Sequence, residues 1–600
     1  MCGIAGYVDP TGALDGRRVL SSLAAALAHR GPDGEGCFSH GPFGLAHRRL
    51  AIIDLSEGGA QPMHIGPISV VFNGEIYNYV ELRNELRQEG QVFSGASDTE
   101  VLARAYLQWG EAFVERLRGM WAFAILDSRS STLLCARDPF GIKPLYYAWL
   151  SGAFVFASEP QALIHAGVPA RANLRVVSQY LALGVSDHEP ACFFDAITPL
   201  AAGAVITVSP GLTIRPARQM GDWAETTAAA STEEFAATLR ESVRLHLRSD
   251  VPVGTCLSGG LDSSTVAALA SSAARDAGAT HFSAVTAISS DPARDERKYA
   301  AAVVQHSQLD WHTVAPTAAD FVAEIDLSIR AQGEPTLSPS TYFQYCVMRE
   351  ARDRGLKVML DGQGADELLC GYERYVPVWA LENARRVGVF SALRGFARLA
   401  RGSRPGLWGM TALAAYVLHP RLRRRVISSR AWFLKKSYVD CVLELVARIS
   451  NASRDLHQAR LADIAWFSLP ALLRFEDRNS MIHSIEARVP YVDRAVVSCA
   501  LRLPDLGLLH NGFTKYPLRV FGASVLPPDI AWRRNKIGFE PPTQTWLAAL
   551  GHRMESEVAQ SSLIRRLCAT VPRLPEQPLA VQWRMYNLAR WQHLFAVAAD

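Results

Sequence analysis

The spacing of apolar and polar positions changes once along the chain and divides it into two parts. In the first 200 or so residues, apolar stretches are short and lie between polar turns. Residues 68–78 (ISVVFNGEIYN) predict a strand that runs into a glycine turn. Residues 120–127 (MWAFAILD) and 131–138 (STLLCARD) flank a polar turn and predict a β-hairpin.

One helix of this first part has a recognisable start and end, at residues 97–110 (SDTEVLARAYLQWG). Ser97 is the expected N-cap, Glu100 stands three residues later as in a capping box, and Gly110 ends the helix. Short strands with few helices predict a sheet-rich α/β domain over residues 2–210.

From about residue 233 the chain alternates between buried strands and helices of about ten residues. The expected strands and helices are 251–257, 263–274, 281–289, 296–306, 310–316 and 356–360. Strands separated by helices predict βαβ units, and therefore a doubly wound parallel sheet with ligands at the carboxyl ends of its strands. This second part extends over residues 233–600.

The bulk composition indicates a globular protein and argues against nucleic-acid binding and membrane insertion. A chain of 600 residues exceeds what one core usually serves, and 49% hydrophobic with 20% charged residues is typical of a globular protein. The net charge of +4 is too small to indicate nucleic-acid binding. No apolar run reaches the ~18 residues of a membrane span, and no leader pattern opens the chain. We therefore expect a cytoplasmic protein without stable membrane insertion.

The ten cysteines form no CxxC pair, which argues against a zinc site or a disulfide framework and favours buried, reduced thiols. Cys2 differs from the others because it directly follows the initiator methionine. Removal of Met1 would give Cys2 a free α-amine, which titrates near pH ~8. An amine of this kind can take the proton of a neighbouring thiol and so activate it as a nucleophile.

Polar motifs recur at the predicted strand ends of the first part. They are MCGI, HRGPDG, HRRLAIID, FNGEIYN, SDTE and RDPFGIKPLYY. Each one alone is compatible with a turn or a helix cap. In this order, over residues 2 to 200, they resemble the glutamine amidotransferase domain of the N-terminal-nucleophile class found in asparagine synthetases.

This resemblance implies a catalytic role for Cys2. The thiol would attack the side-chain amide of glutamine, form a thioester and release ammonia, while its own amine carries the proton. The Asn73 side chain and the Gly74 backbone N–H match the family's positions for stabilising the oxyanion, at ~3 kcal/mol per donor.

The resemblance also implies how glutamine is held. Arg49 would bind the α-carboxylate, for which a planar guanidinium is well suited. Asp98 would bind the α-ammonium, and Glu75 joins Asn73 in contacting glutamine.

A second motif, SGGLDSS at residues 258–264, follows a predicted strand and enters a helix. Backbone N–H groups in such a turn can approach an anion closely, although the motif lacks the Walker A pattern. It resembles the pyrophosphate loop of the ATP-pyrophosphatase family, which splits ATP into AMP and pyrophosphate. The ATP-binding residues implied are Leu257, Ser258, Gly259, Gly260, Asp262, Ser263 and Gly362.

The stretch 361–372 (DGQGADELLCGY) supplies Asp366 and Glu367 at another strand end. In the same family Asp262 and Asp366 match the two metal ligands. Two carboxylates from adjacent strand ends suit an octahedral Mg²⁺ that also takes phosphate oxygens.

Two later segments complete the resemblance to asparagine synthetases. Residues 474–493 are similar to the helical segment that lines the acceptor pocket, and residues 533–542 contain Lys536, which matches a catalytic lysine at the α-phosphate. The resemblance implies ATP- and Mg²⁺-dependent amidation of a carboxylate through an acyl-adenylate. The best match is aspartate to asparagine, with ammonia channelled between the domains.

Two alternatives stay open. Asparagine synthetases usually have Ser-Gly-Asp/Glu-Gly where this chain has Asp361 and Gln363, so the same machinery could amidate a different acid in a specialised biosynthetic pathway. A non-enzymatic glutamine-binding paralogue is the other alternative, and the intact Cys2 argues against it. Dimers are common in the family, so a homodimer is one expectation.

Residues 385–436 depart from the rest of the chain in charge. They hold thirteen Lys or Arg and no Asp or Glu, and include RLRRRVISSR. A solvated helical face is the favoured interpretation. The alternative is a docking surface for an anionic partner, namely an acidic carrier protein, a phosphorylated substrate or a membrane surface.

Overall fold

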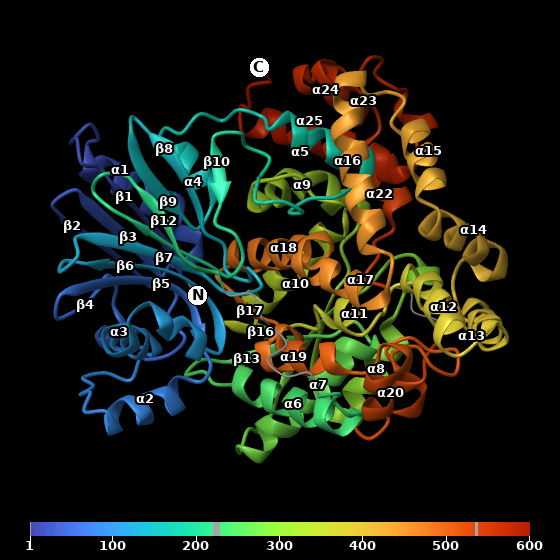
Figure 1. Ribbon diagram of the computed structural model, residues 1–600, viewed down its shortest axis with the longest axis horizontal. Helices are drawn as coiled ribbons and strands as arrows, with labels where there is room; N and C mark the ends of the chain where they lie inside the picture. Colours follow the sequence, from blue (N-terminus) through green and yellow to red (C-terminus); the bar gives the residue numbers. More distant parts are fainter. Residues whose placement is uncertain (1, 220–227, 535–537, 600) are drawn as a thin grey trace.

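The computed structural model describes residues 2–219, 228–534 and 538–599, and contains three β-sheets (Figure 1). Two antiparallel sheets lie in the N-terminal part, and a parallel sheet with helices on both faces lies in the C-terminal part. Met1 and Lys536 lie outside the described residues. No helix among the described residues is long and apolar enough to cross a membrane.

The two N-terminal sheets have six strands each. In spatial order the first contains β10 (Ile197–Pro199), β8 (Tyr146–Leu150), β9 (Ala153–Ala157), β1 (Gly3–Val8), β3 (Phe43–Arg49) and β2 (Gly34–His40). The second contains β12 (Ile214–Gln219), β11 (Ala204–Val208), β7 (Thr132–Arg137), β6 (Gly119–Asp127), β5 (Ile68–Ile76) and β4 (Met63–Ile65). The predicted hairpin is confirmed, with Asp127 opposite Thr132, and the strand predicted within 68–78 is β5. The expected glycine turn is wrong, because Gly74 lies within this strand, opposite Trp121 of β6.

Alternation along the strands explains why these sheets pack in layers. On β5, Val71 points into the core between the two sheets, while Val70 and Phe72 point to the opposite face, beneath α2 (Tyr79–Gln88) and α3 (Asp98–Trp109). The outer face of the first sheet is covered by α1 (Gly16–Ala26), α4 (Pro160–His165) and α5 (Leu174–Leu183). The result is a helix–sheet–sheet–helix sandwich, in agreement with the predicted sheet-rich α/β domain.

The start of α3 corrects one detail of the sequence prediction. Ser97 is the N-cap, because its hydroxyl accepts a hydrogen bond from the Glu100 N–H at 3.3 Å. The Glu100 carboxylate accepts no hydrogen bond from the Ser97 backbone N–H in the described structure, so the predicted capping box is wrong. It accepts instead from the backbone N–H groups of Ser94 and Gly95, at 2.9 and 2.7 Å, because the preceding turn brings these donors to it.

The C-terminal sheet is parallel, as predicted. Its spatial order is β15 (Asp310–Val314), β14 (Ser283–Ala287), β13 (Val253–Cys256), β16 (Val358–Leu360) and β17 (Glu486–Arg488). One face is covered by α6 (Thr232–His246), α7 (Leu261–Asp276) and α8 (Arg297–Ser307); α10 (Ser340–Asp353) and α18 (Leu469–Met481) cover the other (Figure 1). Strand order reverses between β13 and β16, which is the switch point of a doubly wound sheet.

Strand β17 corrects the expectation that residues 474–493 are helical. The helix α18 ends at Met481, and Glu486–Arg488 then pairs in parallel with β16. This strand has no apolar run, so hydrophobic periodicity does not reveal it. Its two charged side chains are buried because they pair with each other, Arg488 Nε donating to Glu486 Oε1 at 2.6 Å.

The remaining helices surround this sheet or extend from it (Figure 1). They are α9 (Ala318–Gln332), α11 (Ala365–Leu368), α12 (Tyr375–Arg386), α13 (Val389–Arg401), α14 (Gly406–Leu418), α15 (Pro420–Arg430), α16 (Lys436–Ala452), α17 (Leu456–Ala462), α19 (Arg494–Arg502), α20 (Tyr516–Gly522), α21 (Pro528–Ala531), α22 (Thr543–Leu550), α23 (His552–Gln560), α24 (Ser562–Leu567) and α25 (Leu579–Leu594). All ten cysteines are free thiols, and most of them are buried, as expected.

Candidate active sites

Cys2 lies at the entrance of β1, between the two antiparallel sheets. Its backbone N–H donates to Asn73 Oδ1 at 3.0 Å, and its Sγ lies 3.9 Å from the Leu50 carbonyl oxygen. The side chain is only 7% exposed, and burial raises the pKa of the thiol. A thiol with a raised pKa needs a base, which is the role that the N-terminal amine can fill.

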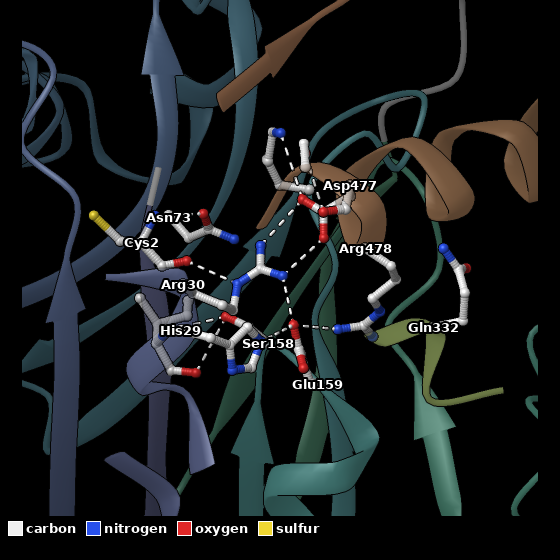
Figure 2. Close-up of polar contacts among 12 residues, drawn as sticks. Cys2, His29, Arg30, Asn73, Ser158, Glu159, Gln332, Asp477 and Arg478 are labelled. Carbon is white, nitrogen blue, oxygen red and sulfur yellow. Dashed lines mark hydrogen bonds and ion pairs between the residues drawn. The ribbon is translucent and has the colours of Figure 1, made fainter. Parts of the chain in front are cut away.

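Asn73 and Gly74 occupy adjacent positions on β5. Asn73 lies beside Cys2 (Figure 2). Asn73 is fully buried, and its Nδ2 has no hydrogen-bond partner among the described residues. A buried donor without a partner costs free energy unless a ligand accepts its hydrogen bond. Gly74 faces Trp121 of β6, and a Cβ at this position would lie 2.1 Å from the Met120 carbonyl oxygen, so only glycine fits.

The three other side chains predicted to hold glutamine lie near Asn73 and Gly74. They are Arg49 and the two buried acids Glu75 and Asp98. Asp98, the first residue of α3, accepts from the Ile76 N–H at 3.0 Å, and burial raises its pKa to about 6. Burial and the nearby carboxylates of Glu486 and Asp98 raise the pKa of Glu75 well above its usual range. This excess of buried acids favours a ligand that brings a positive charge.

Arg49 follows at the end of β3, where its guanidinium is held by backbone carbonyls. It donates to the oxygens of Ser56, at 2.8 Å, and Asp54. A Cβ on Gly59 would lie 2.3 Å from Arg49 Nη2, so the loop that carries Gly59 closes tightly over the guanidinium. The structure thus brings Arg49, Asn73 and Cys2 to one end of the sandwich.

Arg30, which the sequence did not single out, connects this pocket to the C-terminal part (Figure 2). Its fully buried guanidinium donates from Nε to the Cys2 carbonyl at 3.1 Å and from Nη1 to Glu159 at 2.7 Å. It also pairs with both carboxylate oxygens of Asp477 on α18, at 2.8 and 3.0 Å. The backbone of the candidate nucleophile is therefore tied to a helix that covers the parallel sheet.

The loop 258–264 follows β13 and enters α7, as the pyrophosphate-loop resemblance implies. Gly259 has φ of +73°, and a Cβ there would lie 2.6 Å from the Ala300 backbone nitrogen. The hydroxyls of Ser258 and Ser263 hydrogen-bond to each other at 2.9 Å across the turn. A Cβ on Gly362 would lie 2.8 Å from the Ser263 nitrogen, so the loops after β13 and β16 are in direct contact.

The two predicted metal ligands also come together. Lys515 Nζ forms ion pairs with Asp262 Oδ2 at 2.5 Å and with Asp366 Oδ1 at 2.6 Å, so both carboxylates lie within reach of one cation. Oxygen donors of this kind suit Mg²⁺, which takes its other ligands from phosphates and water. The described residues contain no group of three or more His, Cys, Asp or Glu placed to hold a metal. The site fits Mg²⁺ bound together with ATP.

Lys515 could not be found from local sequence. It precedes α20, more than 250 residues after Asp262, and lies in no motif that the sequence analysis used. Its side chain is nearly fully buried between the two carboxylates.

Asp361 and Gln363, the two departures from the usual magnesium loop, contact Glu476 of α18. Glu476 hydrogen-bonds to both, and it accepts from Gln344 Nε2. Burial and the adjacent Asp361 carboxylate raise the pKa of Glu476 well above its usual range, and burial also raises the pKa of Asp361. Position 363 lacks a carboxyl group, but Glu476 of α18, about 110 residues later in the chain, places one beside it.

Together, an N-terminal-cysteine pocket and a nucleotide loop on a doubly wound sheet define a glutamine amidotransferase joined to an ATP-dependent ligase. Residues 1–216 match the family model for the glutamine amidotransferase domain, and residues 234–592 match that for asparagine synthase. The chain belongs to the asparagine synthase family, a family of carbon–nitrogen ligases.

Curated relatives resemble the chain over nearly its full length. It is 30% identical to asparagine synthetase [glutamine-hydrolyzing] 1 of Bacillus subtilis, over 91% of this chain and 88% of the relative. It is 32% identical to a putative asparagine synthetase [glutamine-hydrolyzing] of Mycobacterium tuberculosis, over 92% and 89%. It is 28% identical to asparagine synthetase B [glutamine-hydrolyzing] of Escherichia coli, over 94% and 86%.

Proposed function

We propose that the protein transfers the amide nitrogen of glutamine to a carboxylate that ATP has activated as an acyl-adenylate, with aspartate as the acceptor and asparagine as the product. The observation that carries this proposal is the position of α18. Its adjacent residues Glu476 and Asp477 reach Asp361 beside the nucleotide loops and Arg30 behind Cys2, respectively. One rigid helix therefore contacts both candidate sites.

In the first half-reaction, residues 2–210 hydrolyse glutamine. After removal of Met1, the Cys2 amine takes the thiol proton, and Sγ attacks the amide carbon of glutamine. Asn73 Nδ2 and the Gly74 N–H donate to the oxyanion, and the collapse of this intermediate releases ammonia and leaves a thioester that water hydrolyses. Arg49 orients the α-carboxylate of glutamine.

The α-ammonium of glutamine is the positive charge that the buried acids Glu75 and Asp98 are suited to receive. Because both carboxylates pay a desolvation cost in the empty pocket, a bound ammonium stabilises their charged forms. Their elevated pKa values support this assignment.

In the second half-reaction, residues 233–600 bind ATP along 257–264 and Gly362. Asp262 and Asp366 would hold Mg²⁺, which supplies charge neutralisation at the phosphates. The acceptor carboxylate attacks the α-phosphorus and pyrophosphate leaves; ammonia then attacks the acyl carbon and AMP leaves. On the family resemblance, we assign Lys536 to neutralising charge at the α-phosphate. Lys515, which pairs with Asp262 and Asp366, would neutralise charge on the pyrophosphate.

Ammonia has to travel between the two sites without meeting bulk water, which would protonate it. One continuous apolar core joins the two parts, and includes Ile52, Met120 and Ile142 from the sandwich and Leu257 beside the nucleotide loop. We propose that ammonia passes along this apolar interface.

A second candidate function keeps this machinery but amidates another carboxylic acid. The contact between Asp361 and Glu476 favours it, because two hydrogen-bonded carboxyl groups beside the adenylate change the polar lining of the acceptor site. Acceptor selection is expected to be sharp, since a site that pairs a substrate's charged groups rejects analogues without them by ~10⁴-fold.

The test supplies ATP, Mg²⁺, an ammonium salt and aspartate, and measures pyrophosphate and asparagine. We expect both products in the wild type and in Cys2→Ala, which loses only glutamine-dependent synthesis. Asp262→Asn is expected to keep glutaminase activity and lose ATP/pyrophosphate exchange. Absence of aspartate-dependent pyrophosphate release, in a preparation with intact glutaminase, would reject aspartate. If the double variant Asp361→Ser/Gln363→Glu then turned over aspartate, positions 361 and 363 would be shown to determine the choice of acceptor acid.

A further inference from the structure

The basic segment, residues 385–436, forms the end of α12 and the helices α13, α14 and α15. These helices lie along one edge of the molecule, on the side away from the two antiparallel sheets (Figure 1). Twelve of the thirteen cations are exposed. Only Arg386 and Arg404 of the twelve pair with a carboxylate, on Glu382 and Glu540, within the described part of the chain. The edge therefore carries a dense positive charge that these two ion pairs only partly neutralise.

The same segment also exposes large apolar side chains. The side chain of Phe390 on α13 is 91% exposed, and that of Trp408 on α14 is 88% exposed. The segment contributes eight of the sixteen large apolar side chains that are exposed in the described residues, although it is only 52 residues long. The eight are Val387, Val389, Phe390, Leu393, Leu407, Trp408, Leu422 and Trp432.

Helical spacing places cations and apolar groups on common faces. On α13, Phe390, Arg394 and Arg401 are separated by four and seven residues and point outward, while Leu399 and Ala400 on the opposite face are buried. The helix α14 has no charged residue at all, and Leu407 and Trp408 stand on its exposed side. An apolar helix is thus flanked by two arginine-rich helices.

We propose that α13, α14 and α15 form a peripheral docking surface for an anionic lipid bilayer. Helices with exposed aromatic and aliphatic groups beside Arg or Lys bind at the interface of anionic membranes, with the apolar groups among the headgroups and the cations at the phosphates. Tryptophan in particular is enriched at that depth. Because no described helix can span a bilayer, the attachment is to one membrane surface.

The apolar pattern favours a bilayer over an acidic protein. Phe390 and Trp408 are almost fully exposed on helices at the edge of the molecule, and a fluid lipid interface accepts such side chains without a preformed recess. A protein partner would need a complementary pocket for each of them. An acidic peptide would engage the arginines and leave the exposed aromatic groups unexplained.

The test is co-sedimentation of the full-length protein with vesicles of phosphatidylcholine alone or mixed with an equal amount of phosphatidylglycerol. We expect binding to the anionic vesicles that weakens as salt rises, and at least tenfold weaker binding to the neutral ones. Arg424→Glu/Arg425→Glu and Phe390→Ser/Trp408→Ser are each expected to weaken binding at least tenfold. Arg17→Glu/Arg18→Glu, a matched change of two exposed arginines on the N-terminal part, is expected to leave it unchanged.

Trp408 provides a second readout. Vesicles with brominated phosphatidylglycerol are expected to quench the fluorescence of the wild type and of Trp149→Phe, a control at an exposed tryptophan on β8, and to quench Trp408→Phe less. Failure to bind anionic vesicles at low salt would overturn the proposal. Salt-sensitive binding to polyglutamate without binding to vesicles would also overturn it, in favour of an acidic protein partner.

Discussion

Asn73 illustrates how a single residue combines two roles at the candidate glutaminase site. Its Oδ1 fixes the Cys2 backbone, whereas its buried Nδ2 has no partner among the described residues. We propose that Nδ2 donates to the oxyanion that forms when the thiol attacks glutamine.

Asn73→Ala is therefore expected to lower glutaminase kcat by about 10²–10³-fold, as measured for loss of other oxyanion donors. Synthesis from an ammonium salt should stay at the wild-type rate. Asn78→Ala serves as the control, because within the described residues the Asn78 side chain bonds to the backbone of residues 116 and 118. An equal loss of both activities in the Asn73 variant would mean that Asn73 supports the fold and not the chemistry.

Asp98 gives a pH dependence whose sign follows from its raised pKa of about 6. Acidification from pH 7 to pH 5 protonates this carboxylate in the free enzyme, so it no longer attracts the α-ammonium of glutamine. We expect the KM for glutamine to rise about tenfold at pH 5, since each pH unit below the pKa costs a factor of ten. The KM should be high and independent of pH in Asp98→Asn. A wild-type KM that is flat between pH 5 and 7 would remove Asp98 from ammonium binding.

At the level of helices and strands, the elements that the sequence predicts are those with a regular apolar pattern. The strands β5, β6, β7 and β14 each bury a continuous or alternating apolar run, and α7 and α8 lie between strands at the expected spacing. Strand β17 escapes the same analysis because it is three residues long and two of them are charged. Its burial depends on a partner strand and an internal ion pair, which local pattern does not contain.

The same distinction holds for the candidate sites. Cys2, Asn73, Asp262 and Asp366 lie in contiguous motifs, so the sequence can place them on strand ends. Lys515, Glu476 and Arg30 each contact residues more than one hundred positions away. Only the folded chain shows these contacts, because they follow from how α18 and α20 pack.

Arg423 corrects one expectation about the basic segment, since it is buried and does not belong to a solvated face. Its guanidinium donates to the carbonyls of Tyr416 and Val417 and to the Ser450 hydroxyl, and so joins α14, α15 and α16. Arg423→Ala is expected to destabilise the protein by about 2–4 kcal/mol, because three buried acceptors lose their donor. Thermal unfolding should show a lower Tm for this variant, and no change for the exposed neighbour in Arg424→Ala. Equal Tm values for the two variants would contradict this role.

On the scale of the whole molecule, α18 is the element through which the two sites are connected. The buried Arg30 side chain bonds to the Cys2 carbonyl and to Asp477 of α18 at once. A movement of α18 can therefore reach Cys2 through this one side chain. The geometry is suited to coupling glutamine hydrolysis to the presence of an activated acceptor.

Asp477→Asn is expected to weaken this coupling while both half-reactions persist. We expect the ratio of glutamate to amide product to rise several-fold, because hydrolysis continues without synthesis. Asp505→Asn breaks a comparable ion pair, with the buried Arg460, entirely within the C-terminal part and provides the control. An identical ratio in the two variants would show that Asp477 stabilises the fold without linking the sites.

The central claim is that glutamine nitrogen, released at Cys2, becomes the amide of a product made at the ATP site. Its most direct test is to incubate the protein with glutamine labelled with ¹⁵N in the side-chain amide, ATP, Mg²⁺, aspartate and excess unlabelled ammonium, and to analyse the asparagine by mass spectrometry. We expect asparagine that carries predominantly ¹⁵N, together with AMP and pyrophosphate. Asparagine with unlabelled nitrogen, or glutamate formation without any amide product, would contradict it.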